Sequence, residues 1–184
     1  RTVTGVQTCA LPISLEVFAP NQIDELSKLI NDGFAELIAK ERDRFPGWVA
    51  QVSLAGTNAG ATEAERAIKA GALGVQIYTN VAGKPIDCPE YEQFWAKMNE
   101  LGKPVWIHPA RGAETPDYPL AEKKSKFEIW WGLGWSYETA CAMSRLVWSR
   151  TLDKYPNLRI LVHHFGGIVP MLERSEEHTS ELQS

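Results

Sequence analysis

The stretch from Gly74 to His108 reads GVQIYTNVAGKPIDCPEYEQFWAKMNELGKPVWIH, and its pattern decides the fold. It opens with a short apolar run, GVQIYT, and closes with another, PVWIH. Between them, residues 89–101 place large apolar side chains at the spacing of one helix face. Two buried strands joined by a helix form a parallel βαβ unit. The stretch therefore predicts an α/β protein with a parallel sheet.

The same alternation continues on both sides of this unit. Upstream, the sequence predicts a helix over 21–44, a strand over 48–54 and a helix over 63–70 capped by Thr62. Downstream, it predicts a helix over 137–155 and a strand over 159–164. These continuous apolar strands are typical of a sheet buried on both faces. No Gly-rich nucleotide loop follows any strand, which disfavours a Rossmann fold. Spacing alone leaves a barrel and an open doubly wound sheet as alternatives.

The two ends of the chain carry a different signal. The last residues, 174–184, read RSEEHTSELQS, and a DNA sequence that encodes them also encodes TGVQTCALPI followed by Ser on its opposite strand, as in Thr4–Ser14. One sequencing adapter translated on both strands accounts for both ends. We therefore expect residues 1–14 and 174–184 to be artefact and residues 15–173 to be the authentic segment of a longer protein. Cys9 and His178 then take no part in the chemistry.

Composition excludes several classes of partner. A net charge of −4 gives no reason to expect nucleic acid or an anionic membrane surface. No apolar run approaches the roughly 20 residues that a membrane helix needs. The three cysteines are irregularly spaced, which favours reduced thiols in a cytoplasmic protein over a disulfide framework or a zinc knuckle.

The histidines of the authentic segment all lie at the carboxyl ends of predicted strands. His108 ends PVWIH, and His163 and His164 end RILVHH, before Gly166-Gly167. Function collects at this edge in parallel α/β folds, and imidazole is both a metal ligand and a base near neutral pH. The alternative is that each is a core histidine hydrogen-bonded to backbone. Because strand side chains alternate, we expect one of His163 and His164 to face the pocket and the other to face the helices or to lie in the turn.

Other polar and aromatic residues near these strand ends are candidates for substrate contact. Arg111 could hold a carboxylate through a bidentate contact. The tryptophans of the loop after it could wall a pocket for a flat substrate or simply pack on the rim of the barrel. Asn80 and Trp106 belong to neighbouring strands and are further candidates. The lysines of the loop are better explained as a solvated face. Glu138 is expected to favour the dipole of the helix that follows, and Cys141 to serve packing.

Three segments of the chain resemble one known family. They are GVQIYTNVAGKPID at 74–87, KPVWIHPARG at 103–112 and GWSYETACAMSRLVWSRTLDKYPNLRILVHHFGG at 134–167. They resemble the aminocarboxymuconate-semialdehyde decarboxylase branch of the amidohydrolase superfamily, which includes gamma-resorcylate decarboxylases. The resemblance spans nearly all of residues 15–173. It implies a partial (β/α)8 TIM barrel containing about strands 3 to 6 with their helices.

The resemblance also implies roles for the histidines. His108 matches the strand 5 metal ligand of the family, whose divalent ion is usually zinc. His164 matches the acid/base histidine of an H-x-G-G motif. His163 would contact the metal ligands without binding the ion itself. The family's His-x-His of strand 1 and aspartate of strand 8 have no counterpart in this chain. We therefore expect the chain alone to bind zinc poorly and to be inactive.

Three functions stay open from the sequence. The first is a metal-dependent carboxy-lyase acting on a small aromatic or unsaturated carboxylic acid, homodimeric in its complete form, as the resemblance implies. The second is a metal-dependent hydrolase of the same superfamily, of the lactonase type. The third is a translated gene fragment with no function of its own.

Overall fold

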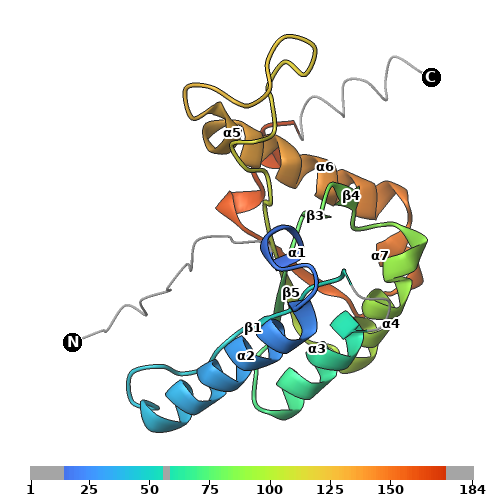
Figure 1. The fold of residues 1–184 in the computed structure, drawn as a ribbon. Coiled ribbons are helices and arrows are strands. Elements are labelled where there is room, and N and C mark those ends of the chain that lie inside the picture. The colour runs from blue at the N-terminus through green and yellow to red at the C-terminus, as the bar shows by residue number, and fades with distance from the viewer. Residues whose placement is uncertain (1–14, 56–58, 173–184) are drawn as a thin grey trace.

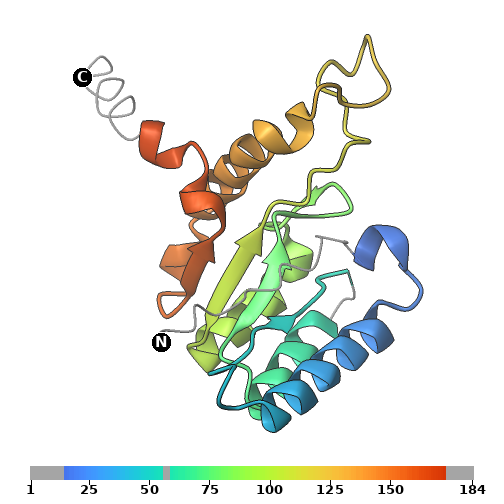
Figure 2. The same ribbon diagram turned by 90° about the vertical axis from the view of Figure 1, so that its left-hand side faces the viewer.

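A computed structural model describes residues 15–55 and 59–172 and places four parallel strands in one sheet. The strands are β1 (Ala50–Gln51), β2 (Val75–Tyr78), β5 (Pro104–His108) and β6 (Arg159–Val162), and they lie side by side in that order (Figures 1 and 2). Spatial order follows chain order throughout, whereas a doubly wound sheet reverses its order at a switch point. The arrangement is therefore that of successive βα units of a barrel.

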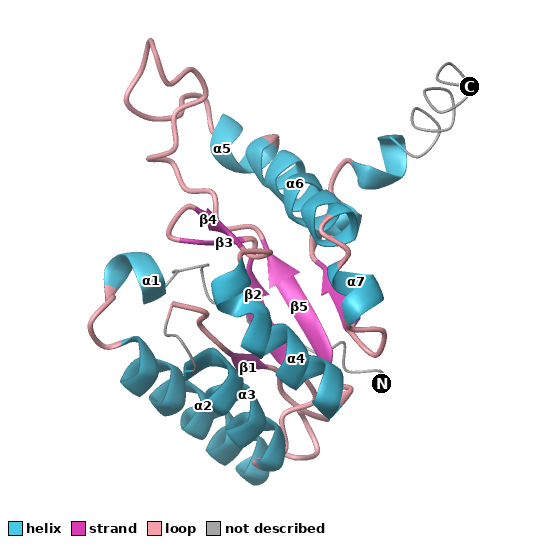
Figure 3. Cartoon of the chain, turned by 90° about the vertical axis from the view of Figure 1, so that its right-hand side faces the viewer, coloured by secondary structure: helices cyan, strands magenta, loops and turns pink. Residues whose placement is uncertain are grey.

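Helices connect these strands and cover one face of the sheet. Helices α2, α3 and α4 follow one another along that face (Figure 3), and α6 and α7 lead from β5 to β6. A small antiparallel hairpin follows β2 directly. The remaining bounds are α1 Leu15–Phe18, α2 Ile23–Lys40, α3 Ala59–Lys69, β3 Asn80–Val81, β4 Lys84–Pro85, η1 Pro89–Tyr91, α4 Glu92–Leu101, α5 Ile129–Gly132, α6 Gly134–Trp148, α7 Thr151–Lys154 and η2 His164–Gly166.

The predicted elements are present, but several boundaries differ. The strand predicted over 48–54 is reduced to β1, of two residues. Helix α3 already begins at Ala59, so Thr62 lies inside the helix and is not its cap, contrary to the prediction. The helix predicted over 137–155 divides into α6 and α7 because Arg150, at φ 59°, leaves the helical region between them.

The two faces of the sheet differ in burial. On the helix-covered face, Val75, Ile77, Val105 and Ile107 are all 0% exposed. On the other face, one register row runs through Gln51, Gln76, Trp106 and Leu161, which are half-buried except for Leu161, exposed at 45%. The expectation of strands buried on both faces is therefore wrong for this row. This less buried face, on the side away from the helices, is the one that lines the interior of a barrel. We call it the open face.

The β1 edge of the sheet is completed by a side chain. Asn31 of α2 is 0% exposed. Its Oδ1 accepts from the Gln51 N–H at 2.9 Å, and its Nδ2 donates to the Gln51 carbonyl at 2.9 Å. The amide thus supplies the donor and acceptor that a neighbouring strand would supply. Because Nδ2 also donates to Glu63 of α3 at 2.7 Å, the contact ties two helices to the sheet edge.

Some predictions fall outside this description. The expected adapter ends, with Cys9 and His178, lie outside the described residues. Within residues 15–55 and 59–172, no helix is long and apolar enough to cross a membrane.

Candidate active site

His108 is the most deeply placed of the candidate residues. It ends β5 and is 2% exposed. Its Nδ1 lies 2.7 Å from the Pro109 carbonyl oxygen, and because a carbonyl can only accept, Nδ1 carries the proton. Burial lowers the pKa of His108 to about 4, with smaller contributions from His163 and His164. The ring is therefore neutral near pH 7, and its Nε2 lone pair is left for a ligand.

The other two histidines gather around His108. The ring centroid of His163 lies 4.7 Å from that of His108, and the ring centroid of His164 lies 5.5 Å from it. The prediction that only one of the pair faces the site is therefore wrong, whereas the alternative that the second histidine lies in the turn is confirmed, because His164 begins the turn η2. His163 keeps extended geometry, with φ −67° and ψ 166°, and its N–H still donates to the Ile107 carbonyl of β5. His164 adopts φ 54°, which breaks the alternation and brings its ring toward His108 as well. We call these three residues the histidine cluster.

The two added histidines differ in their surroundings. His163 is half-buried, its Nε2 has no hydrogen-bond partner among the described residues, and burial lowers its pKa. His164 is exposed, and its ring lies 5.2 Å from the Trp135 ring at an interplanar angle of 32°. His164 is thus the member of the cluster that a dissolved molecule can reach, beside an aromatic surface.

A carboxylate that the sequence assigned to the helix dipole instead joins the strand ends. Glu138 of α6 accepts hydrogen bonds from the Thr79 hydroxyl, from Asn80 Nδ2 at 2.7 Å and from the Ala110 N–H at 3.1 Å. These groups follow β2 and β5, so Glu138 fixes α6 over the carboxyl edge of the sheet. No local pattern reveals this contact because its partners lie 28 to 59 residues away in sequence.

The predicted substrate-contact residues have other partners in the structure. Asn80 uses both ends of its amide, donating to Glu138 and accepting from the Gly83 N–H at 2.8 Å. Arg111 donates through Nη2 to the Pro116 carbonyl at 3.1 Å and lies 3.4 Å from Asp117, while its Nε has no partner among the described residues. Their roles toward a substrate stay predictions.

Trp106 and the loop tryptophans lie at different depths. Trp106 shares the open face of the sheet with His108 but stands two residues earlier on β5, roughly 7 Å deeper along the strand. Trp130 and Trp131 pack edge-on against Trp135, which itself stands edge-on to His108 with ring centroids 5.2 Å apart. The loop tryptophans thus pack together around Trp135, and their role in walling a pocket stays a prediction.

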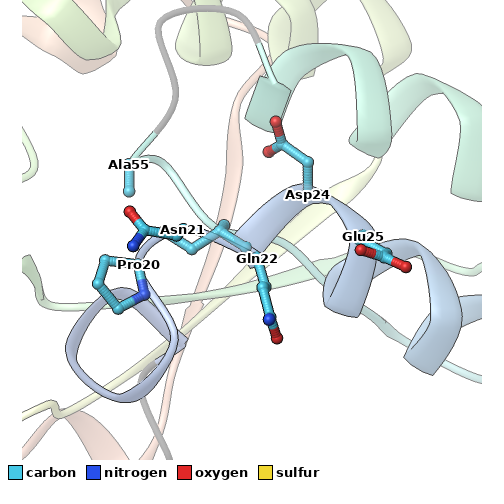
Figure 4. A pocket seen from close by; sticks show the side chains of 7 residues that line it. Pro20, Asn21, Gln22, Asp24, Glu25 and Ala55 are labelled. Carbon is cyan, nitrogen blue, oxygen red and sulfur yellow. The ribbon is translucent and has the colours of Figure 1, made fainter.

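A surface hollow elsewhere in the molecule lacks the residues of this site. It has a volume of about 270 Å³ and lies where α1 leads into α2. Figure 4 shows the carboxylates of Asp24 and Glu25 at its rim, and no histidine or cysteine lines it. We assign it no chemistry.

The described residues fit a bound metal ion only in part. His108 offers one prepared donor, its Nε2, and the cluster adds two more imidazoles nearby. Nevertheless, within residues 15–55 and 59–172 no group of three or more His, Cys, Asp or Glu side chains is arranged to hold an ion. A catalytic zinc usually has three protein ligands. The described residues therefore do not complete such a set of ligands.

Parallel strands in chain order, with histidines gathered at their carboxyl ends, define a segment of a TIM-barrel protein. The chain belongs to the Amidohydrolase family, whose model matches residues 11–183.

Relatives and solved structures agree with this family. The chain is 34% identical over 171 residues to a gamma-resorcylate decarboxylase of Rhodococcus jostii, covering 85% of this chain and 50% of that protein. It is 27% identical over 162 residues to a 2-amino-3-carboxymuconate-6-semialdehyde decarboxylase of Dictyostelium discoideum, covering 86% and 43%. A dihydroxybenzoic acid decarboxylase from Polaromonas sp. JS666, solved with manganese and 2-nitroresorcinol, superposes with a TM-score of 0.70 at 28% identity over 81% of this chain and 46% of that one. The chain thus spans about half the length of the curated relatives it matches.

Proposed function

We propose that this chain is part of a metal-dependent carboxy-lyase that acts on a small aromatic carboxylic acid. The observation that carries the proposal is the histidine cluster at the carboxyl edge of the sheet, in a family whose matched relatives are named decarboxylases. A decarboxylase needs a proton donor beside a surface that holds a flat ring, and His164 beside Trp135 meets this need.

In this proposal His164 supplies the proton that replaces the carboxylate. Protonated His164 gives its proton to the ring carbon that bears the carboxylate. The bond from that carbon to the carboxylate then breaks, its electron pair restores the aromatic ring, and carbon dioxide leaves. Neutral His164 takes up a proton from solvent, which its exposure permits.

His108 would contribute one ligand, through Nε2, to a divalent ion whose other ligands come from outside the described residues. When bound, such an ion orients the substrate carboxylate and a neighbouring oxygen and withdraws charge from them. We propose zinc, as the resemblance implies, although the Polaromonas neighbour was solved with manganese. The inactivity of the chain alone, the homodimer and the cytoplasmic location of the complete protein stay predictions.

Two measurements test the proposal. Reading the source DNA outward should reveal a His-x-His upstream and an aspartate at a strand end downstream; coding sequence that continues without them would rule out the metal mechanism. The complete protein should then release carbon dioxide from 2,6-dihydroxybenzoate. Lactone hydrolysis without release of carbon dioxide would point to the hydrolase alternative instead.

A further inference from the structure

The peptide that follows His108 links it to a carboxylate on another element. The carbonyl of the Pro109–Ala110 peptide accepts the His108 Nδ1 proton at 2.7 Å. The N–H of the same peptide donates toward Glu138 Oε1 at 3.1 Å and Thr79 Oγ1 at 3.0 Å. The Thr79 hydroxyl in turn donates to Glu138. Both routes from the Ala110 N–H therefore end on the Glu138 carboxylate.

A peptide in this position passes polarisation from one side to the other. The N–H and C=O of one peptide share a conjugated plane, so a negative charge at the N–H end draws electron density toward the oxygen. A carbonyl oxygen with more electron density is a stronger hydrogen-bond acceptor for the His108 Nδ1 proton. Hydrogen bonding at one imidazole nitrogen fixes the tautomer and raises the basicity of the other, as carboxylates do when they contact metal-binding histidines directly.

We infer that Glu138 is a positioning residue that acts on His108 through the Pro109–Ala110 peptide, holding the ring with Nδ1 protonated and Nε2 free. A direct carboxylate–histidine contact is replaced here by one that includes a peptide group. The use of Nε2 as a ligand rests on the proposed function, but the tautomer does not. Because His108 is only 2% exposed, water does not compete for its Nδ1 proton, and the Pro109 carbonyl is the acceptor.

A role limited to tying strand ends together is the competing explanation for Glu138. Such a role needs a hydrogen-bond acceptor that reaches Asn80, Thr79 and Ala110. A glutamine keeps an acceptor oxygen of the same reach but carries no charge. The substitution Glu138→Gln therefore separates the electrostatic effect on His108 from the structural one, and Glu138→Ala removes both.

The test reads the His108 ring directly, without metal, substrate or turnover. The 184-residue chain is labelled with ¹⁵N-histidine, and long-range ¹H–¹⁵N correlation spectra are recorded, with His108→Gln to assign the signals. We expect the Nδ1–H tautomer in the unmodified chain, an upfield shift of that proton in Glu138→Gln, and loss of the single tautomer in Glu138→Ala. Glu36→Gln, an exposed glutamate paired with Lys40, is the matched control and should change none of these signals.

Two results would overturn the inference. One is an Nε2–H tautomer for His108 in the unmodified chain, which needs no variant at all. The other is a folded Glu138→Gln chain whose His108 signals match the unmodified ones. If Glu138→Ala does not fold, the spectra of Glu138→Gln and of the unmodified chain still test the effect of Glu138 on His108. Because no catalysis is measured, failure of the decarboxylase proposal would leave this result unaffected.

Discussion

His164 combines exposure with a constrained backbone. Its φ of 54° is uncommon for a residue with a Cβ, and Phe165 follows at φ 55° with 98% of its side chain exposed. A run of two such residues turns the chain away from β6 and brings the His164 ring against Trp135. Backbone geometry of this kind concentrates at functional sites because the fold must stabilise it elsewhere.

The proposed proton donor makes a direct prediction. Changing His164 to Gln in the complete protein should lower kcat for release of carbon dioxide about 10²- to 10⁴-fold, because glutamine cannot transfer a proton. KM should change much less, since the amide keeps the size and polarity of the side chain. Steady-state assays on His164→Gln, with Glu36→Gln as a surface control, measure both values. Retention of full kcat would remove His164 from the mechanism.

At the scale of elements, the edge of β1 depends on Asn31. Asn31→Leu should lower the free energy of unfolding by about 2–3 kcal/mol, because it leaves the partly buried Gln51 N–H and carbonyl without partners. Urea unfolding followed by circular dichroism measures the difference.

The matched control lies on the same helix. Leu29 is 66% exposed, so Leu29→Ala should change the free energy of unfolding by less than about 0.5 kcal/mol. An Asn31→Leu variant as stable as the unmodified chain would show that the amide does not complete the sheet edge.

The same elements show what sequence patterns can and cannot predict. PVWIH predicts β5 to the residue because its apolar run is flanked by strand partners on both sides. WVAQVSL predicts too long a strand for β1, since the hydrogen bonds toward β2 run only from Trp48 to Val52, and the buried Leu54 lies beyond them. The places of His108 and His164 at the ends of β5 and β6 are predictable because strand ends are visible in sequence. The Glu138 contacts are not predictable because their partners are distant in sequence, and the approach of the His164 ring to His108 is not predictable because it depends on one backbone angle.

At the scale of the whole molecule, one sheet edge is open in the described part of the chain. Strand β6 pairs only with β5 there, and Leu161 is 45% exposed on its open face. Unpaired strand edges next to apolar surface promote association. We expect the purified chain to self-associate with rising concentration, as measured by sedimentation velocity. Leu161→Lys should weaken this association, whereas Leu29→Lys should not; a monomer at all concentrations would contradict the expectation.

Metal binding belongs to the same scale, because the ligands must converge from many strands. The described residues prepare one donor, His108 Nε2, and no arranged group of three. We therefore expect the chain alone to lose zinc on dialysis, as measured by elemental analysis. Retention of one zinc per chain that disappears in His108→Gln would show that the histidine cluster is a sufficient site.

Because the Asn31 amide occupies the β1 edge, a further strand can pair with the sheet only at the β6 edge of the described residues. Within residues 15–55 and 59–172, one edge is closed by a side chain, which offers no further hydrogen-bonding groups to another strand, and the β6 edge has no further partner. A body with one adhesive edge can pair with a second copy through a two-fold axis, and both open edges are then used up. Such a molecule ends as a closed pair, while a sheet open at both edges would add copies without limit and form fibres.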